Sequence, residues 1–302
     1  MPALALSITI ASWNTRKDME DCLRSLEAVR GELPFEVIVV DNASTDGTPE
    51  MIEELFPWVR LLRMPKNVYF TGAHNRALSV RNAPHAFLLN SDTIVHKGAL
   101  KTLAAYSVAH PEVGIIGPKL LNPDGSLQFS CRRFPNPLAT LFRNTFLGRM
   151  FPNNKYTREY LMTDWSHDQS REVDWVSGAA MFVTQEAMAK VGLLDPNYLM
   201  FCEDVDWCYR VNKAGLKVVY LPQSEITHAI GRSTSQAAKK MLFRFHASML
   251  RFYRVNMLPD VAWPIRPFAY VGAAIALFLR ASLFITKILI DEMARRKEDK
   301  KV

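Results

Sequence analysis

Two groups of acidic residues stand where carboxylates could bind a ligand or take up a proton. Asp92 follows the apolar residues 86–89 after one amide and one hydroxyl, those of Asn90 and Ser91. A short apolar run of this kind predicts a strand buried on both faces, and ligands of α/β proteins bind beyond the carboxyl ends of such strands. The alternative is structural, with the Asp92 carboxylate capping the next helix.

The second group consists of Glu203, Asp204 and Asp206, at the start of a predicted helix. Acids in the first turn of a helix are favoured by the helix dipole, which is sufficient reason for Asp206. Three negative charges within four residues also repel one another. We therefore expect a further, functional reason for this cluster.

The elements that must position these acids alternate between strands and helices. The pattern predicts strands at residues 6–12, 35–40, 59–63, around Phe87 and at 113–117, with helices such as 71–80 and 97–110 between them. This alternation implies an α/β fold with a mainly parallel sheet flanked by helices. The architecture is of a nucleotide-binding type, although the sequence has neither a G-x-G-x-x-G motif after the first strand nor a G-x-x-x-x-G-K-[ST] motif.

Three segments carry a resemblance to a known family: residues 7–14, residues 40–48 (V-D-N-A-S-T-D-G-T) and residues 88–92 (L-L-N-S-D). They resemble family 2 glycosyltransferases of the GT-A fold, and are most similar to the branch of bacterial rhamnosyltransferases. The resemblance covers about residues 4–235. It implies a metal-dependent, inverting transfer of a sugar from a nucleotide-sugar donor.

On the donor side, the resemblance assigns contacts to the nucleotide. The acid that matches Asp41 contacts the base, and a carboxylate there could accept the imide N–H of uracil or thymine. Asn67, Gly72 and Asn75 fit the family's N-x-G-F-x-x-G-x-N pattern over the nucleotide. The implied nucleotide-sugar contacts are Ser12, Asn14, Asp41, Asn42, Ser44, Asn67, Asn75, Asn90, Ser91 and Arg232.

The resemblance also implies a metal site. The acid that matches Asp92 ends the family's D-x-D-type motif and holds a divalent metal on the sugar diphosphate. Asn90 stands where the strict motif has its first acid, so we expect Asp92 to share the metal with His228, whose H-x-x-G-x-S pattern resembles the family's. A lone histidine after a strand is otherwise usually structural. The expected cofactor is Mg²⁺ or Mn²⁺, because these hard cations combine one or two protein oxygens with phosphate oxygens.

Glu203 and Asp204 match the family's E-D motif, which makes Asp204 the expected general base and Glu203 the fallback. One carboxylate is needed on the acceptor side, because the acceptor hydroxyl attacks from the face opposite the diphosphate and must lose its proton. The Q-x-x-R-W signature of processive synthases is absent after this helix, which favours transfer of a single sugar.

Residues 118–235 are expected to form the acceptor half. Within residues 119–130, the sequence Asn-Pro-Asp-Gly predicts a hairpin turn, and residues 173–183 regain strand character. In the resemblance, Asp174 and Trp175 are acceptor-binding candidates, with core packing as the alternative for Trp175. A set of basic residues is expected on a solvated face: Arg132, Arg133, Arg143 and Arg149.

The basic character of the chain lies at its C-terminal end. Residues 232–302 carry a net charge of +9 and the rest −2, which indicates a local anionic partner rather than a nucleic acid. Residues 268–290 are almost wholly apolar and long enough to cross a bilayer, but Arg280 and Lys287 interrupt them. We expect an amphipathic helix in the plane of the membrane surface; a membrane span, or an oligomer or core helix, is the alternative.

These features lead to one hypothesis for the chain. Residues 1–235 form a GT-A domain, with 1–117 as the nucleotide-sugar half, and residues 236–302 form a membrane-associating extension. The donor is dTDP-rhamnose or another dTDP- or UDP-sugar, and the acceptor is a lipid-linked saccharide or polysaccharide precursor. The chain has no leader-like N-terminus and no redox or zinc spacing of cysteines, so we expect it at the cytoplasmic face of the membrane. A homo-oligomer is compatible with this hypothesis.

Two other functions compete with this hypothesis. A sugar-nucleotide nucleotidyltransferase would need a glycine- and arginine-rich loop after the first strand, which residues 12–15 (S-W-N-T) do not form. A non-catalytic membrane-surface binding protein on a GT-A scaffold would have no need for Asp41, Asp92, Asp204 and His228.

Overall fold

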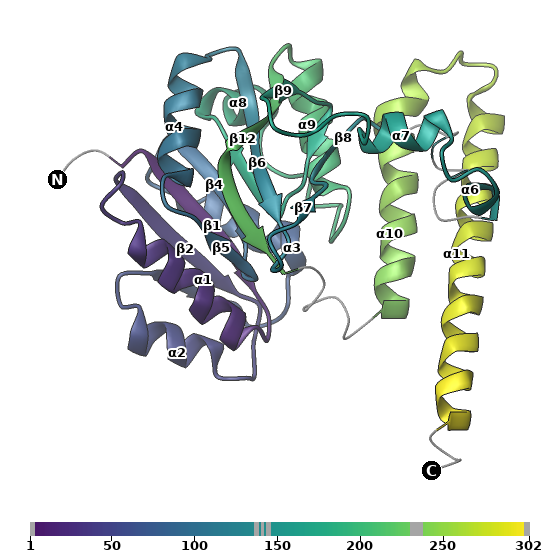
Figure 1. Cartoon of the computed structure of the whole chain (residues 1–302). Coiled ribbons are helices and arrows are strands. Elements are labelled where there is room, and N and C mark those ends of the chain that lie inside the picture. Colours follow the sequence, from purple (N-terminus) through teal and green to yellow (C-terminus); the bar gives the residue numbers. More distant parts are fainter. Residues whose placement is uncertain (1–3, 136–138, 140–141, 143–145, 230–237, 299–302) are drawn as a thin grey trace. The chain divides into compact units, whose positions relative to one another are not determined.

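The computed structural model describes residues 4–135, 139, 142, 146–229 and 238–298. The chain divides into two compact units. One comprises Met1–Asn197 and Glu203–Ile230, and the other comprises Tyr198–Cys202 and Gly231–Val302. The first is an α/β unit and the second is helical (Figure 1).

A ten-stranded sheet forms the centre of the first unit. Its order is β3-β2-β1-β4-β11-β6-β12-β5, with β7 paired to β6 and β9 paired to β12. The strands are β1 (Leu6–Ser12), β2 (Phe35–Asp41), β3 (Arg60–Arg63), β4 (His85–Asn90), β5 (Thr93–Val95), β6 (Val113–Leu121), β7 (Leu127–Gln128), β9 (Arg171–Glu172), β11 (Ala180–Val183) and β12 (Lys217–His228). The β3-β2-β1-β4 part is entirely parallel, β6 and β12 are parallel to each other, and β11 runs antiparallel between β4 and β6. The predicted largely parallel α/β sheet is confirmed.

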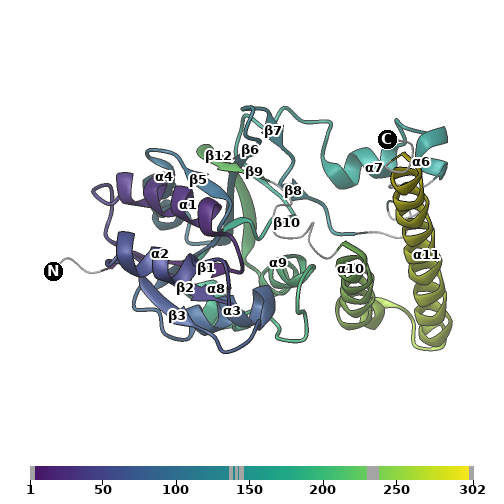
Figure 2. The same ribbon diagram turned by 90° about the horizontal axis from the view of Figure 1, so that it is seen from below.

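Helices cover both faces of this sheet. The helices of the first unit are α1 (Arg16–Ala28), α2 (Thr48–Leu55), α3 (Tyr69–Leu78), α4 (Ala99–Ala109), α6 (Phe146–Met150), α7 (Lys155–Leu161), α8 (Gln185–Val191) and α9 (Glu203–Lys213); of these, α7 contacts β8 (Cys131–Arg132), which is not part of the main sheet. The side chains of β2 show why both faces are apolar: Val37 and Val39 join the core under α1, α2 and α4, whereas Ile38 and Val40 pack against α3. Figure 2 shows α1 and α4 on the side of the sheet opposite to α3.

The acceptor half differs in detail from the sequence prediction. The hairpin predicted within residues 119–130 is confirmed as β6 and β7. The strand predicted at 173–183 is instead split into β10 (Trp175–Val176) and β11, because the chain turns at Ser177, where the N–H of Ala180 bonds the C=O of Ser177 at 3.4 Å. β10 leaves the main sheet and pairs with β8 (Cys131–Arg132).

The second unit contains two long helices, α10 (Ala238–Phe252) and α11 (Arg266–Glu298), which lie side by side (Figures 1 and 2). Residues 198–202 belong to this unit by their contacts. Ser248 of α10 donates to the C=O of Met200 at 3.0 Å, and the ring of Phe201 packs edge-on against Phe245. The guanidinium of Arg251 lies 5.2 Å from the ring centre of Tyr198, which is fully buried.

One side of α11 faces α10 and the other exposes apolar side chains. Leu277 and Ala281 are buried, and Arg280 reaches Met249 of α10 at 3.8 Å. The exposed apolar side chains of α11, three or four residues apart with one adjacent pair, are Phe268, Val271, Ile275, Phe278, Leu279 and Leu283. Residues 266–286, with a mean hydropathy of 1.9, are long and apolar enough to cross a membrane. The side chain of Lys287 lies outside the described residues.

The close packing of α8 and α9 on β6 yields a test of the fold. A Cβ atom on Gly114 of β6 would lie 2.7 Å from Val211 and 3.2 Å from Ala187. Gly114→Ala should therefore destabilise the protein by about 1–3 kcal/mol, because overpacking a filled core forces its neighbours apart. Its melting temperature should fall accordingly. The matched control is Gly31→Ala, where a Cβ meets nothing within 4 Å; an equal effect of both substitutions would contradict this packing.

Candidate active site

Three polar residues end neighbouring parallel strands at one edge of the sheet. Ser12 of β1 lies opposite Asp41 of β2, and Ala11 lies opposite Asn90 of β4. The N–H of Asn42 also bonds the C=O of Ser12 at 2.8 Å, which closes the edge beyond the strands. The sheet register alone therefore brings Ser12, Asp41 and Asn90 together.

The loop after β2 folds around the Asp41 carboxylate. One oxygen, Oδ2, accepts the N–H of Ser44 at 2.9 Å, whereas Oδ1 is buried without a hydrogen-bond partner. Asn14 holds the loop from the other side, because its N–H donates to Ser44 Oγ at 2.9 Å and its Oδ1 accepts the N–H of Thr45 at 2.8 Å. A buried carboxylate oxygen without a partner is suited to accept a hydrogen bond from a ligand.

Three of the asparagines predicted to contact the nucleotide use their side chains to hold loops. Asn42 Oδ1 accepts the N–H of Val68 at 3.0 Å, and Asn67 Oδ1 accepts the first N–H of α3 at 2.8 Å. Asn75 exchanges two hydrogen bonds with the backbone of Leu194, at 2.8 and 3.2 Å. These amides thus shape the walls of the site.

Asp92 and His228 lie together although 136 positions separate them in the chain. β5 pairs antiparallel with the end of β12, so that Thr93 lies opposite His228, and Ala229 N–H bonds the C=O of Asp92 at 2.9 Å. As a result, His228 Nε2 is 3.3 Å from Asp92 Oδ1, and both side chains are largely buried. Ser91 is buried beside them.

Gln128 sets the protonation of the His228 ring. Its Nε2 donates to the C=O of His228 at 3.1 Å and to Asn122 Oδ1 at 3.0 Å, so its Oε1 must be the group that accepts from His228 Nδ1 at 2.7 Å. Nδ1 therefore donates to Gln128. Nε2 is directed at Asn90 Nδ2, at 3.2 Å, and at the Asp92 carboxylate. Gln128 lies on the two-residue strand β7, and no pattern in the sequence indicated it as a site residue.

The pair formed by His228 Nε2 and Asp92 Oδ1 suits a divalent cation. The two acceptors are close enough to bind one ion, and a histidine ligand whose other nitrogen donates a hydrogen bond is the usual arrangement around protein metals. Within the residues that the structure describes, no third His, Cys, Asp or Glu completes a metal cluster. This fits a cation that takes its remaining ligands from phosphate and water oxygens.

The second group of acids occupies the first turn of α9. Asp204 Oδ2 accepts the N–H of Gly178 at 3.0 Å, and its Oδ1 accepts the N–H of Val205 at 2.8 Å. Glu203 is buried, and its Oε2 has no hydrogen-bond partner. Asp206 forms a buried ion pair with Arg210 at 2.8 Å, which agrees with the structural reading of that acid.

The surroundings of Glu203 and Asp204 affect the pKa values of these two neighbouring acids differently. Burial raises the pKa of Glu203 well above its usual range, and the charge of Asp204 raises it further. Burial also raises the pKa of Asp204, but the N–H groups of Gly178 and Val205 and the charge of Arg132 act in the opposite direction. Ionisation of Asp204 is therefore favoured over that of Glu203.

One backbone turn joins the two groups of acids. Gly178 donates its N–H to Asp204, and the next residue, Ala179, accepts the N–H of Asn90 at 2.9 Å through its C=O. Asn90 in turn contacts His228. A possible metal pair and a possible base thus lie on either side of one short turn.

The two predicted acceptor-binding residues, Asp174 and Trp175, bond to the residues that follow β8. Asp174 pairs with Arg133 at 3.0 Å and accepts the N–H of Phe134 at 2.6 Å. Trp175 is mostly buried, and its indole N–H donates to the C=O of Arg133 at 2.9 Å. Arg133 is exposed, as expected for a solvated face, and is paired there with Asp174. Arg143 and Arg232 lie outside the described residues.

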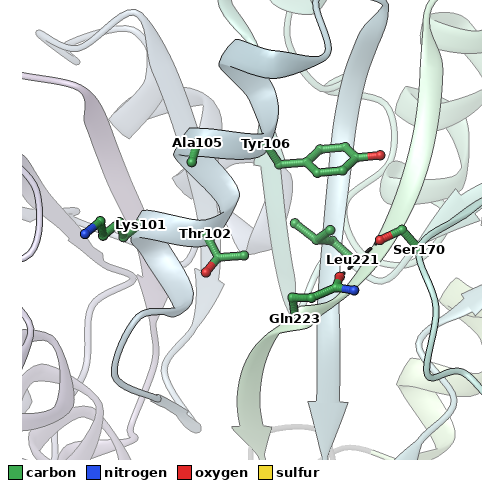
Figure 3. A pocket seen from close by; sticks show the side chains of 7 residues that line it. All are labelled: Lys101, Thr102, Ala105, Tyr106, Ser170, Leu221 and Gln223. Atoms are coloured by element: carbon green, nitrogen blue, oxygen red, sulfur yellow. Dashed lines mark hydrogen bonds between the residues drawn. The ribbon is translucent and has the colours of Figure 1, made fainter.

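A separate, open cavity of about 540 Å³ lies between α4 and β12 (Figure 3). On one side of it, Ser170 donates to Gln223 Oε1 at 3.0 Å (Figure 3). Its lining residues are Lys101, Thr102, Ala105, Tyr106, Ser170, Leu221 and Gln223. None of these side chains is acidic or follows the end of a parallel strand, so this cavity lacks the groups found at the sheet edge.

The comparisons with known proteins agree with this geometry. The family model described as "Glycosyltransferase like family 2" matches residues 2–245. The N-acetylglucosaminyl-diphospho-decaprenol L-rhamnosyltransferase of Mycobacterium tuberculosis is 30% identical over 258 residues, covering 82% of this chain and 83% of that protein. The dTDP-rhamnosyl transferase RfbF of Shigella flexneri is 22% identical over 240 residues, covering 78% and 74%.

A solved structure shows the same fold. It is the mannosyltransferase PcManGT from Pyrobaculum calidifontis in complex with GDP-Man and Mn²⁺, with a TM-score of 0.54 and 15% sequence identity. The match covers 96% of this chain and 79% of that one, which identifies the fold as GT-A. Together, the family model and the rhamnosyltransferase relatives show that this chain is a glycosyltransferase and belongs to family 2, in its rhamnosyltransferase-like branch.

Proposed function

We propose that this enzyme transfers a single sugar, with inversion, from dTDP-rhamnose or another dTDP- or UDP-sugar to a lipid-linked saccharide or polysaccharide precursor. The observation that carries the proposal is the turn that holds Asp204 on one side and Asn90, next to Asp92 and His228, on the other. The name of the mycobacterial relative, which combines a rhamnosyl donor with a diphospho-decaprenol acceptor, supports it.

The nucleotide would lie over the ends of β1 and β2. Asp41 Oδ1 has the unused acceptor capacity that an imide N–H of thymine or uracil requires. Ser12, Asn14, Asn42 and Ser44 would surround the base and ribose, with Asn67 and Asn75 holding the wall formed by α3.

The diphosphate would lie beyond β4, next to Asn90 and Ser91. Asp92 and His228 would hold Mg²⁺ or Mn²⁺, which supplies positive charge to the departing diphosphate when bound. The hydrogen bond from His228 to Gln128 keeps Nε2 directed at this position. Arg232 is proposed as a further phosphate contact.

Asp204 would act as the general base. It takes the proton of the acceptor hydroxyl while that oxygen bonds to the anomeric carbon, and the bond from this carbon to the diphosphate oxygen breaks. The electron pair leaves with the nucleoside diphosphate. Protonated Glu203 reduces the negative charge beside the base, so that only one carboxylate has to be ionised.

We also propose a division of labour along the chain. Residues 1–235 would carry out catalysis, with 1–117 binding the nucleotide-sugar and 118–235 the acceptor, and residues 236–302 would bind the cytoplasmic face of the membrane. The exposed apolar side chains of α11 and the net charge of +9 after residue 231 support binding to an anionic lipid surface.

Replacing the base tests the catalytic assignment. Asp204→Asn should lower kcat by about 10²–10⁴-fold with nearly unchanged donor binding, because only the proton acceptor is lost. Glu203→Gln, which imitates the protonated acid, should keep at least about a tenth of the activity. Initial rates from pH 5 to 8 should fall on the acid side as Asp204 takes up a proton, at a higher pH than for an ordinary aspartate. Full turnover by Asp204→Asn would remove it as the base.

Calorimetric titration of the nucleoside diphosphate tests the metal pair. Asp92→Asn should abolish the gain in affinity that Mn²⁺ provides, and Gln128→Ala should weaken it by about 10–100-fold, the usual effect of removing a group that orients a metal ligand. His96→Ala, at an exposed histidine bonded to Thr227, serves as the control. Mn²⁺-dependent binding that survives Asp92→Asn would exclude this carboxylate as a ligand.

Co-sedimentation with anionic phospholipid vesicles tests the membrane-binding surface. Phe278→Glu combined with Leu283→Glu should reduce the bound fraction at least tenfold, because each buried side chain of this size contributes about 1.5–3 kcal/mol. The control is Val108→Glu, at a side chain of α4 that is 79% exposed. Equal losses from both variants would show that net charge, rather than the apolar side of α11, governs binding.

A further inference from the structure

Arg132 presents an unneutralised cation on the ribbon formed by β8 and β10. Its guanidinium carbon lies 5.1 Å from the ring centre of Trp175, directly across the ribbon. The neighbouring Arg133 is paired with Asp174, but Arg132 forms no ion pair with any residue that the structure describes. Its hydrogen bond within the chain is a weak one, at 3.4 Å to the C=O of Phe129. Stacking on an aromatic face orients a guanidinium without neutralising its charge.

A second polar group without a partner lies two residues before Arg132. Ser130 directly precedes β8, and Cys131 between the two is fully buried; if the alternation of β8 continues back to Ser130, its side chain shares a face with that of Arg132. Ser130 is 6% exposed, and its hydroxyl has no hydrogen-bond partner. Arg132 Nε is likewise buried without a partner. A buried hydroxyl and a cation with unused donors form a site suited to an anionic oxygen ligand.

This site adjoins Asp204, the proposed general base. The N–H of Ser177 bonds the C=O of Ser130 at 2.8 Å, and the next residue, Gly178, donates its N–H to Asp204. The charge of Arg132 also lowers the pKa of Asp204. In an inverting transfer the base and the acceptor lie on the face of the anomeric carbon opposite the donor diphosphate, so a cation beside the base lies on the acceptor side.

We propose that Arg132, assisted by the hydroxyl of Ser130, binds the phosphate through which the acceptor sugar is linked to its lipid. The inference rests on the proposed function and adds the recognition of a phosphorylated acceptor, in place of a neutral glycan, by this enzyme. Asp174 and Trp175 act through Arg132: they hold the β8 segment and supply the ring on which the guanidinium rests.

Two acceptors with the same sugar test this inference: one linked to a short lipid through a diphosphate, and the other to a neutral alkyl chain. Arg132→Gln should raise the KM for the diphosphate acceptor by about 10–100-fold, the range expected for a lost hydrogen bond to a charged group. At a pH on the alkaline plateau of the rate profile, where Asp204 is ionised with or without the charge of Arg132, the kcat/KM for the neutral acceptor and the KM for the donor should change by less than about twofold. Arg132→Lys keeps the charge but loses the planar fork. Its KM for the diphosphate acceptor should lie between those of the unaltered enzyme and Arg132→Gln.

Arg171→Gln is the matched control, because Arg171 is stacked on Trp165 at the same distance of 5.1 Å. A loss shared by both acceptors in Arg132→Gln and Arg132→Lys would overturn the inference in favour of a structural role. A raised donor KM would overturn it in favour of the donor diphosphate. A shared loss or a raised donor KM can be seen only if the unaltered enzyme turns over. If the unaltered enzyme transfers sugar to neither acceptor, the proposed function is overturned, and this inference with it.

Discussion

The N–H of Gly178 and the C=O of Ala179 hold Asp204 and Asn90 from two successive residues of one turn. Both groups belong to the backbone, so their positions follow from the start of β11 and not from side-chain rotamers. β11 pairs with β4 on one side and β6 on the other, which fixes that start relative to the end of β4. The spacing between Asp204 and Asn90 therefore depends on the sheet register.

Polar side chains of the candidate site fall into two groups. Most of them, such as Asn42, Asn75 and Asp174, form hydrogen bonds with the backbone of neighbouring loops. A few buried groups retain unused capacity, including Asp41 Oδ1 and Glu203 Oε2. Because buried polar groups are normally satisfied, groups with unused capacity at a strand edge are the ones that a substrate would satisfy.

Much of the fold could be predicted from local patterns. Alternating strands and helices indicated the parallel half of the sheet, and the position of Asp41 and Asp92 after apolar runs placed them at its edge. Parallel strands end together, so this inference needs no knowledge of side-chain contacts. The convergence of Asp92 and His228 was available through the family resemblance, since no local pattern connects β5 with the end of β12.

Other parts of the site depend on contacts that sequence patterns do not encode. Gln128 and Arg132 lie on strands of two residues, too short for any periodicity to register. Whether Arg132 faces solvent or Trp175 is decided by the pairing of β8 with β10, 43 positions further along the chain. Likewise, the break between β10 and β11 falls within a run of small and apolar residues that favours a continuous strand.

The segment Tyr198–Cys202 contacts the C-terminal helices and directly precedes α9. Its contacts are with α10, yet the next residue of the chain is Glu203. Phe201 and Cys202 adopt left-handed backbone conformations, with φ of 69° and 63°, which cost about 1–3 kcal/mol each and persist only where surrounding contacts impose them. Trimming the apolar C-terminal helices to obtain a more soluble protein would remove those contacts immediately before Glu203 and Asp204. The backbone that leads into the first turn of α9 therefore depends on helices much further along the chain.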